Sequence, residues 1–142
     1  MNEFLTLFTR ASKLMRGAAD EAMSRHGVRV GQNMVLEVLW DTDGLTPGEL
    51  ADLLHVSTPT VVKSATRMEA TGLVVRRRDE VDRRLVRLFL TDRGRSVRTD
   101  IETARDELER RATASLTDGE RRHLISALRK IIAEMADADP LE

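Results

Sequence analysis

The chain has 142 residues, 41% hydrophobic and 33% charged, which is typical of one folded domain rather than a disordered segment. It has no cysteine, which excludes disulfides, thiolate zinc sites and thiol-based redox sensing, and its 3% aromatic content disfavours single-strand binding by base stacking. The net charge of −1 hides an uneven distribution: residues 57–98 carry 11 Lys and Arg against 5 Asp and Glu, an excess that favours a polyanionic partner.

The chain begins with apolar residues at helical spacing. Within residues 3–26 these are Phe4, Leu7, Phe8, Ala11, Leu14, Met15, Ala18 and Ala22. The pattern predicts an amphipathic helix that ends near Gly27. It lacks the continuous apolar stretch of a signal peptide, and no run in the chain approaches the roughly 18 residues of a membrane span. We therefore expect a cytoplasmic protein with no membrane partner.

Two shorter helices should follow. Apolar positions from Met34 to Leu39 predict a helix over 31–41, which stops at the turn-rich residues 41–44. Thr46 then offers an N-cap, with proline at the first helical position and Glu49 three residues after the cap. This signature predicts a short helix over 47–54.

A helix-turn-helix is predicted next. His55 and Val56 form a tight turn, and Ser57 caps a helix that reads TPTVVKSATRMEATG. Ala51 is small where the two helices must cross, and Val61 fills the joint between them. The turn places His55 where a left-handed backbone is common, which histidine tolerates better than a branched residue.

The rest of the chain predicts a hairpin and two helices. Residues 73–75 form a strand, 76–84 a charged turn, and LVRLFLT a second strand. A long helix over about 92–115 and a last helix opened by the capping box at Thr117 complete the chain. The predicted fold class is mainly α with a small β-hairpin: a winged helix-turn-helix over 31–91, with dimerisation helices over 1–30 and 92–142, in one continuous domain.

The helix after the turn is the first candidate site. Short hydroxyls would let its backbone approach a duplex, its N-terminus favours a phosphate, and long cationic side chains can reach base edges or the backbone. The candidate DNA-binding residues here are Ser57, Thr58, Pro59, Thr60, Lys63, Ser64 and Arg67. The alternative is an ordinary solvated helix face.

The hairpin is the second candidate site. Arg83 and Arg84 at its tip are placed to enter a minor groove, where the negative potential is strong. Asp82 beside them would hold one arginine in position by paired hydrogen bonds. Arg76 and Arg78 would lie at the base of the wing, near flanking phosphates. The alternative is a charged turn that binds nothing.

These motifs together resemble a known family. Residues 45–94, which read LTPGELADLLHVSTPTVVKSATRMEATGLVVRRRDEVDRRLVRLFLTDRG, are similar to the DNA-binding core of the MarR (multiple antibiotic resistance regulator) family. The family's Asp-x-Arg wing tip is present at residues 82–84, its Leu-Thr-x-x-Gly at 90–94, its Ser-x-Pro-Thr-Val at 57–61 and its Gly-Leu-Val at 72–74. Lys63 and Val62 depart from the frequent Arg and Thr, which weakens any transfer of base preference, and His55 replaces a frequent turn glycine.

The resemblance implies a homodimer whose first and last two helices interlock and whose winged parts bind half-sites of a palindromic operator. It also implies a small anionic or aromatic effector, bound between the dimer helices and the winged part. Met15, His26, Met34 and Trp40 are the candidate effector-binding residues, although packing explains each equally well.

The sequence favours no enzyme, cofactor or metal site. The three histidines are scattered, Glu120 and His123 lie one helical turn apart without further ligands, and no phosphate loop or nucleophile elbow is present. We therefore expect a ligand-responsive transcriptional regulator, a repressor of the double-stranded DNA-binding class. The alternative is a winged-helix protein-interaction module that does not bind DNA.

Overall fold

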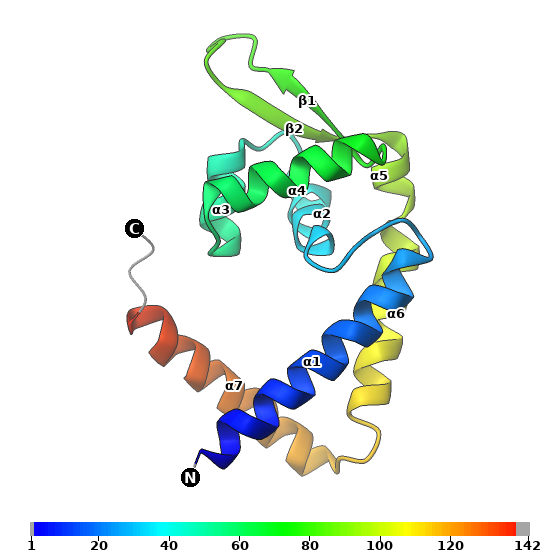
Figure 1. Cartoon of the computed structure of the whole chain (residues 1–142), viewed down its shortest axis with the longest axis vertical. Helices are drawn as coiled ribbons and strands as arrows, with labels where there is room; N and C mark the ends of the chain where they lie inside the picture. Colours follow the sequence, from blue (N-terminus) through cyan, green and yellow to red (C-terminus); the bar gives the residue numbers. More distant parts are fainter. Residues whose placement is uncertain (1, 139–142) are drawn as a thin grey trace.

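A computed structural model describes residues 2–138, and it places a winged helix-turn-helix at one end and long helices at the other (Figure 1). The elements in chain order are α1 (Glu3–Ser24), α2 (Gln32–Asp41), α3 (Pro47–Leu54), α4 (Thr58–Ala70), β1 (Val74–Arg78), β2 (Val86–Leu90), α5 (Asp92–Ser96), α6 (Arg98–Ala112) and α7 (Asp118–Ala138). The predicted fold class, mainly α with one antiparallel hairpin, is confirmed. Among the described helices, none is both long and apolar enough for a bilayer crossing.

The core lies where α2, α3 and α4 meet the hairpin. Fully buried side chains from each element fill it: Leu36, Leu39, Leu50, Ala65, Met68, Leu73, Val74 and Leu88. Ala51 and Val61 are both buried, as the predicted crossing of α3 and α4 requires. The small residue lets the helices approach while the branched one fills the joint.

The turn between α3 and α4 has the predicted backbone. His55 lies in the left-handed region with φ 55°, and its N–H donates to the Ala51 carbonyl. Both predicted N-caps form, because Thr46 Oγ1 accepts from the Glu49 N–H at 3.1 Å and Ser57 Oγ accepts from the Thr60 N–H at 3.3 Å. These caps satisfy N–H groups that a helix leaves free at its start.

The hairpin differs from the prediction in one respect. Residues 76–78, predicted in the turn, belong to β1, and the ladder continues to the pair Arg78–Val86. The Asp79 N–H donates to the Leu85 carbonyl at 2.9 Å. The loop at the tip of the wing is therefore confined to the residues between Asp79 and Leu85. Charged residues can occupy this strand because its outer end is exposed.

The prediction of a single helix over 92–115 is also wrong. It is divided into α5 and α6 at Val97, and α6 ends at Ala112. Val97 and Ile101, four residues apart, are both buried. The helical spacing of apolar residues therefore continues across the break, and the sequence pattern does not reveal that the helix is divided.

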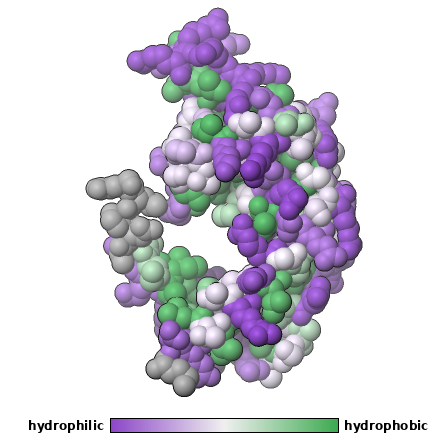
Figure 2. Space-filling view, in the orientation of Figure 1, coloured by the Kyte–Doolittle hydropathy of each residue, from purple (hydrophilic) through white to green (hydrophobic). Residues whose placement is uncertain are grey.

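The long helices leave much of their apolar surface exposed. α1 packs along α6, whereas no described side chain of α7 is buried. Figure 2 shows hydrophobic side chains gathered over α7 and an opening between it and the winged part. The large exposed apolar residues of α1 and α7 are Phe4, Leu5, Leu7, Phe8, Leu14, Met15, Leu124, Ile125, Ile131, Ile132 and Met135.

Candidate nucleic-acid interface

One face of α4 is polar and open. Thr58, Pro59, Thr60, Lys63 and Arg67 are exposed there, at the end of the molecule that carries the wing (Figure 1). The hydroxyls of Ser57 and Thr60 lie 2.8 Å apart at the cap. A helix N-terminus of this kind attracts phosphate through its dipole and its free N–H groups.

The structure adjusts the edges of this face. Ser64 is half-buried and its Oγ lies 3.7 Å from Met68 Sδ, so it sits at the margin of the face. Val62 and Thr66 are exposed on it, although the sequence reading did not select them. The available signal was the interval of four residues from Thr58 to Val62 and again from Val62 to Thr66, which puts all three on one side of a helix.

The wing tip holds an arginine in the predicted way. Arg84 Nε and Nη2 donate to the two carboxylate oxygens of Asp82 at 3.0 and 3.1 Å, and the Arg84 N–H donates to the same group at 3.1 Å. The side-chain bond from Arg84 is the main reason that the pKa of Asp82 is lowered. The Arg84 side chain is 90% exposed, so it is oriented by Asp82 while its other donors face solvent.

The other wing arginines have different surroundings. Arg83 is exposed at the tip, and its carbonyl accepts a 2.8 Å hydrogen bond from Arg78 Nη1. Arg77 stacks over the Phe89 ring, 5.7 Å from its centroid. Arg78 therefore supports the backbone of the tip while its own side chain stays at the surface.

Arg76 lies between the wing and α4 rather than at the outer surface. Its Nη2 donates to the Val62 carbonyl at 3.0 Å and to Thr66 Oγ1 at 2.7 Å. Its N–H donates to a Glu69 carboxylate oxygen at 3.0 Å, and Nη1 lies 3.7 Å from the other oxygen. These bonds fasten β1 to α4 and occupy donors that a phosphate would need.

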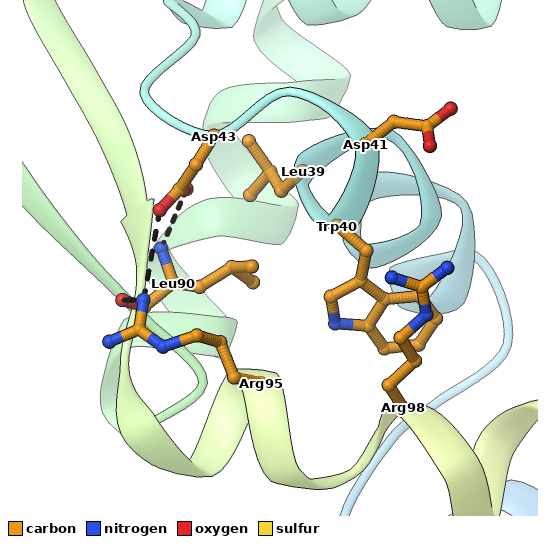
Figure 3. A pocket seen from close by; sticks show the side chains of 7 residues that line it. All are labelled: Leu39, Trp40, Asp41, Asp43, Leu90, Arg95 and Arg98. Atoms are coloured by element: carbon orange, nitrogen blue, oxygen red, sulfur yellow. Dashed lines mark hydrogen bonds and ion pairs between the residues drawn. The ribbon is translucent and has the colours of Figure 1, made fainter.

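Trp40 lines a pocket of about 400 Å³ between α2, β2 and the start of α6 (Figure 3). The Arg98 guanidinium lies over the indole, 5.7 Å from its centroid, and is paired with Glu102 at 2.8 Å. On the other side, Asp43 accepts from the Leu90 N–H at 2.9 Å and lies 3.8 Å from Arg95. An aromatic face and two cationic groups thus border one opening.

The other three candidate effector residues do not line this pocket. Met15 and Met34 are exposed on α1 and α2. His26 is half-buried, with Nδ1 3.5 Å from an Asp100 carboxylate oxygen. Within residues 2–138, no group of three His, Asp or Glu side chains could hold a metal ion.

The chain is similar to known proteins in sequence. The MarR family model matches residues 26–85, which span the helix-turn-helix and most of the wing. The HTH-type transcriptional regulator MgrA of Staphylococcus aureus is 28% identical over 127 residues, which cover 89% of this chain and 85% of MgrA. The regulator TtmR of Methylorubrum extorquens is 38% identical over 76 residues, 54% of this chain and 39% of TtmR.

Solved structures share the fold over almost the whole chain. A MarR transcriptional regulator from Methanosarcina mazei has a TM-score of 0.83 at 24% identity and covers 97% of this chain and 100% of its own. The MepR–DNA complex of S. aureus has a TM-score of 0.83 at 26% identity, over 92% and 97% of the two chains. These relatives are transcription regulators rather than enzymes. The family model, these relatives and the shared winged-helix fold together support a MarR-family winged-helix regulator.

Proposed function

We propose that this regulator binds double-stranded DNA sequence-specifically as a homodimer on a palindromic operator. It acts in the cytoplasm as a repressor of transcription. It releases DNA when a small anionic or aromatic effector binds. The observation that carries the proposal is the exposed Arg84 guanidinium, held by Asp82 at the tip of a wing that is fastened to the polar helix α4.

The arrangement suits both grooves of a duplex. The short hydroxyls, Lys63 and Arg67 on α4 match a major groove, and Arg83 and Arg84 match the adjacent minor groove. S. aureus MepR, which shares the fold, was solved as a complex with DNA. Repression follows if the operator overlaps a promoter, because a bound dimer then excludes the polymerase.

Salt dependence tests the DNA proposal. A duplex recovered by selection from a random pool is titrated at several salt concentrations with the full chain. Arg84→Ala should weaken binding and reduce the log–log salt slope by about 0.9, the value for one lost phosphate contact. Arg110→Ala on α6, an exposed arginine outside the wing, is the control and should change neither quantity. Absence of duplex binding by the wild-type chain at low salt would instead favour a protein-interaction module.

The exposed apolar faces of α1 and α7 support the homodimer. Large contiguous apolar surfaces on a soluble chain mark interaction sites. A second copy with the same faces would cover them in a two-fold interface, which supports the proposal that residues 1–30 and 92–142 serve dimerisation. Two recognition helices set about 34 Å apart would then meet successive major grooves.

The Trp40 pocket supports the effector. An aromatic anion would stack on the indole and pair with Arg95 or Arg98 at the border between α2 and α6. Trp40 is the one tryptophan of the chain, so its fluorescence reports binding directly. Benzoate should quench this fluorescence and weaken the DNA complex over one concentration range. Unchanged fluorescence and unchanged DNA affinity at saturating benzoate would argue against this pocket for aromatic carboxylates.

A further inference from the structure

Asp79 organises the loop of the wing without pointing outward. Its Oδ1 accepts from the Val81 N–H at 2.8 Å and from the Asp82 N–H at 2.7 Å. The Asp82 N–H bond is the largest of the effects that lower the pKa of Asp79 to about 2. Asp79 therefore fixes the backbone of the residue whose carboxylate holds Arg84.

Arg87 connects this loop to the helix-turn-helix. Its Nε donates to Asp79 Oδ2 at 2.6 Å, and its Nη1 donates to the Gly44 carbonyl at 2.9 Å. The same Nη1 lies 3.6 Å from Glu49 Oε1 on α3. Asp79 and Arg87 are only 18% and 29% exposed, unlike Arg84 at the tip. One guanidinium thus spans the distance from the wing loop to α3.

The wing needs such a connection because its sheet is small. A two-stranded hairpin alone is only marginally stable in water. Leu45 pairs with Leu88 and gives the middle of β2 a second backbone partner besides β1. Arg87 is the next residue toward the tip, so its bonds extend the anchoring past that point.

We propose that Asp79 and Arg87 are positioning residues that set the place of the Arg84 guanidinium relative to the recognition helix α4, and that neither touches DNA. The proposal rests on the DNA binding proposed above. The alternative is a direct role, in which the Arg87 guanidinium itself pairs with a DNA phosphate. The two differ in whether the contribution of Arg87 depends on Arg84.

A double-mutant cycle separates them. Asp79→Asn and Arg87→Gln are made in the full wild-type chain and in an Arg84→Ala background, and binding is measured with the duplex recovered by selection. Each change should weaken binding about tenfold in the wild-type chain and less than about twofold in the Arg84→Ala background, because the positioned group is then already gone. The salt slope of the Arg84→Ala/Arg87→Gln variant should equal that of Arg84→Ala.

The controls exclude a general loss of folding. Glu109→Gln breaks an exposed pair with Arg121, away from the wing and from the Trp40 pocket, and should leave affinity unchanged. Arg87→Lys keeps the charge but lacks the fork that reaches both Asp79 and Gly44, so it should not restore affinity. Helical content by circular dichroism confirms that each variant is folded, and Arg87→Gln carries the test if Asp79→Asn unfolds.

Two results would overturn the proposal. Equal losses in both backgrounds would make the effects independent of Arg84. A salt slope lowered by a further amount of about 0.9 in the Arg84→Ala/Arg87→Gln variant would show that Arg87 contacts a phosphate. Failure of the wild-type chain to bind any duplex is a separate result, since it refutes the proposed function before the cycle begins.

Discussion

The indole Nε1–H of Trp40 donates a 2.8 Å hydrogen bond to the carbonyl oxygen of Gly94, which joins α2 to α5. The other side of Gly94 is closed by backbone, because a Cβ placed there would overlap the Leu73 carbonyl oxygen. Arg93, the residue before Gly94 in the helix, donates to the Thr71 carbonyl. The short helix α5 is therefore held to the winged part from three directions.

Gly94→Ala should destabilise the fold. The added methyl group meets a carbonyl oxygen that cannot rotate away, and we expect the free energy of unfolding to fall by about 3 kcal/mol, the upper range for overpacking. Urea unfolding followed by circular dichroism measures it. Gly48→Ala in α3 is the matched control: its Cβ would meet only Thr46 Oγ1, at 3.9 Å, and the change should stay within about 0.5 kcal/mol. Equal effects at both positions would contradict the overlap.

His55→Gly should stabilise the chain. A left-handed backbone strains a side chain with a Cβ and costs glycine nothing, so we expect a gain of about 0.5–1 kcal/mol in unfolding free energy. His55→Asn should be close to wild type, and His55→Val should lose stability because its side chain is branched. Thermal unfolding of the three variants gives the order. A valine variant as stable as the glycine variant would refute the argument from backbone strain.

Acid should remove a specific contribution of Asp79. The pKa of this residue in the folded chain, about 2, lies below the ordinary value of 3.8. Ionised Asp79 therefore stabilises the fold at neutral pH, and this contribution is lost as the pH falls from about 4 toward 2. The stability difference between wild type and Asp79→Asn should be constant above about pH 5 and shrink in that acid range. A carboxyl titration by NMR with a midpoint near 3.8 would contradict this prediction.

Ile132→Glu should separate the proposed homodimer. Ile132 is 65% exposed on the apolar face of α7, so a carboxylate there would be buried unpaired between two copies. Sedimentation should show a dimer for wild type and a monomer for the variant. Lys130→Glu introduces the same side chain on the opposite side of α7 and should remain dimeric. A wild-type chain that sediments as a monomer would end the dimer proposal.

The local signals predicted most of the winged part. Caps at Thr46 and Ser57, the left-handed His55 and the pairing of Asp82 with an arginine follow from short-range chemistry, and each is present. Interactions across the fold were harder to infer. Arg76 and Arg83 both lie in the arginine-rich segment and look alike in the sequence. Arg76, however, is held by Thr66 and Val62, which are 10 and 14 residues away in sequence.

The division of the predicted long helix had the same cause. Its break depends on α5 being fixed by Trp40, which is 54 residues from Gly94 in sequence. The periodicity of residues 97–101 fits either one helix or two, because both buried positions keep their spacing. Asp79 and Arg87 were likewise missed as partners, since eight residues across a hairpin give no pattern in a linear sequence.

Because the helix is divided at Val97, α6 would move as a rigid rod relative to α5 if the backbone angle at this residue changed. With α5 held to the winged part, Val97 is one of the points at which the angle between the two ends of the molecule would change. α6 has 15 residues, so it is about 22 Å long. A rotation of about 10° at Val97 would displace the far end of α6 by about 4 Å, more than a whole base-pair step of B-DNA. If the proposed effector binds beside Trp40 and Arg98, a small change there would alter the spacing of the two winged parts in the proposed homodimer and so weaken its fit to a duplex.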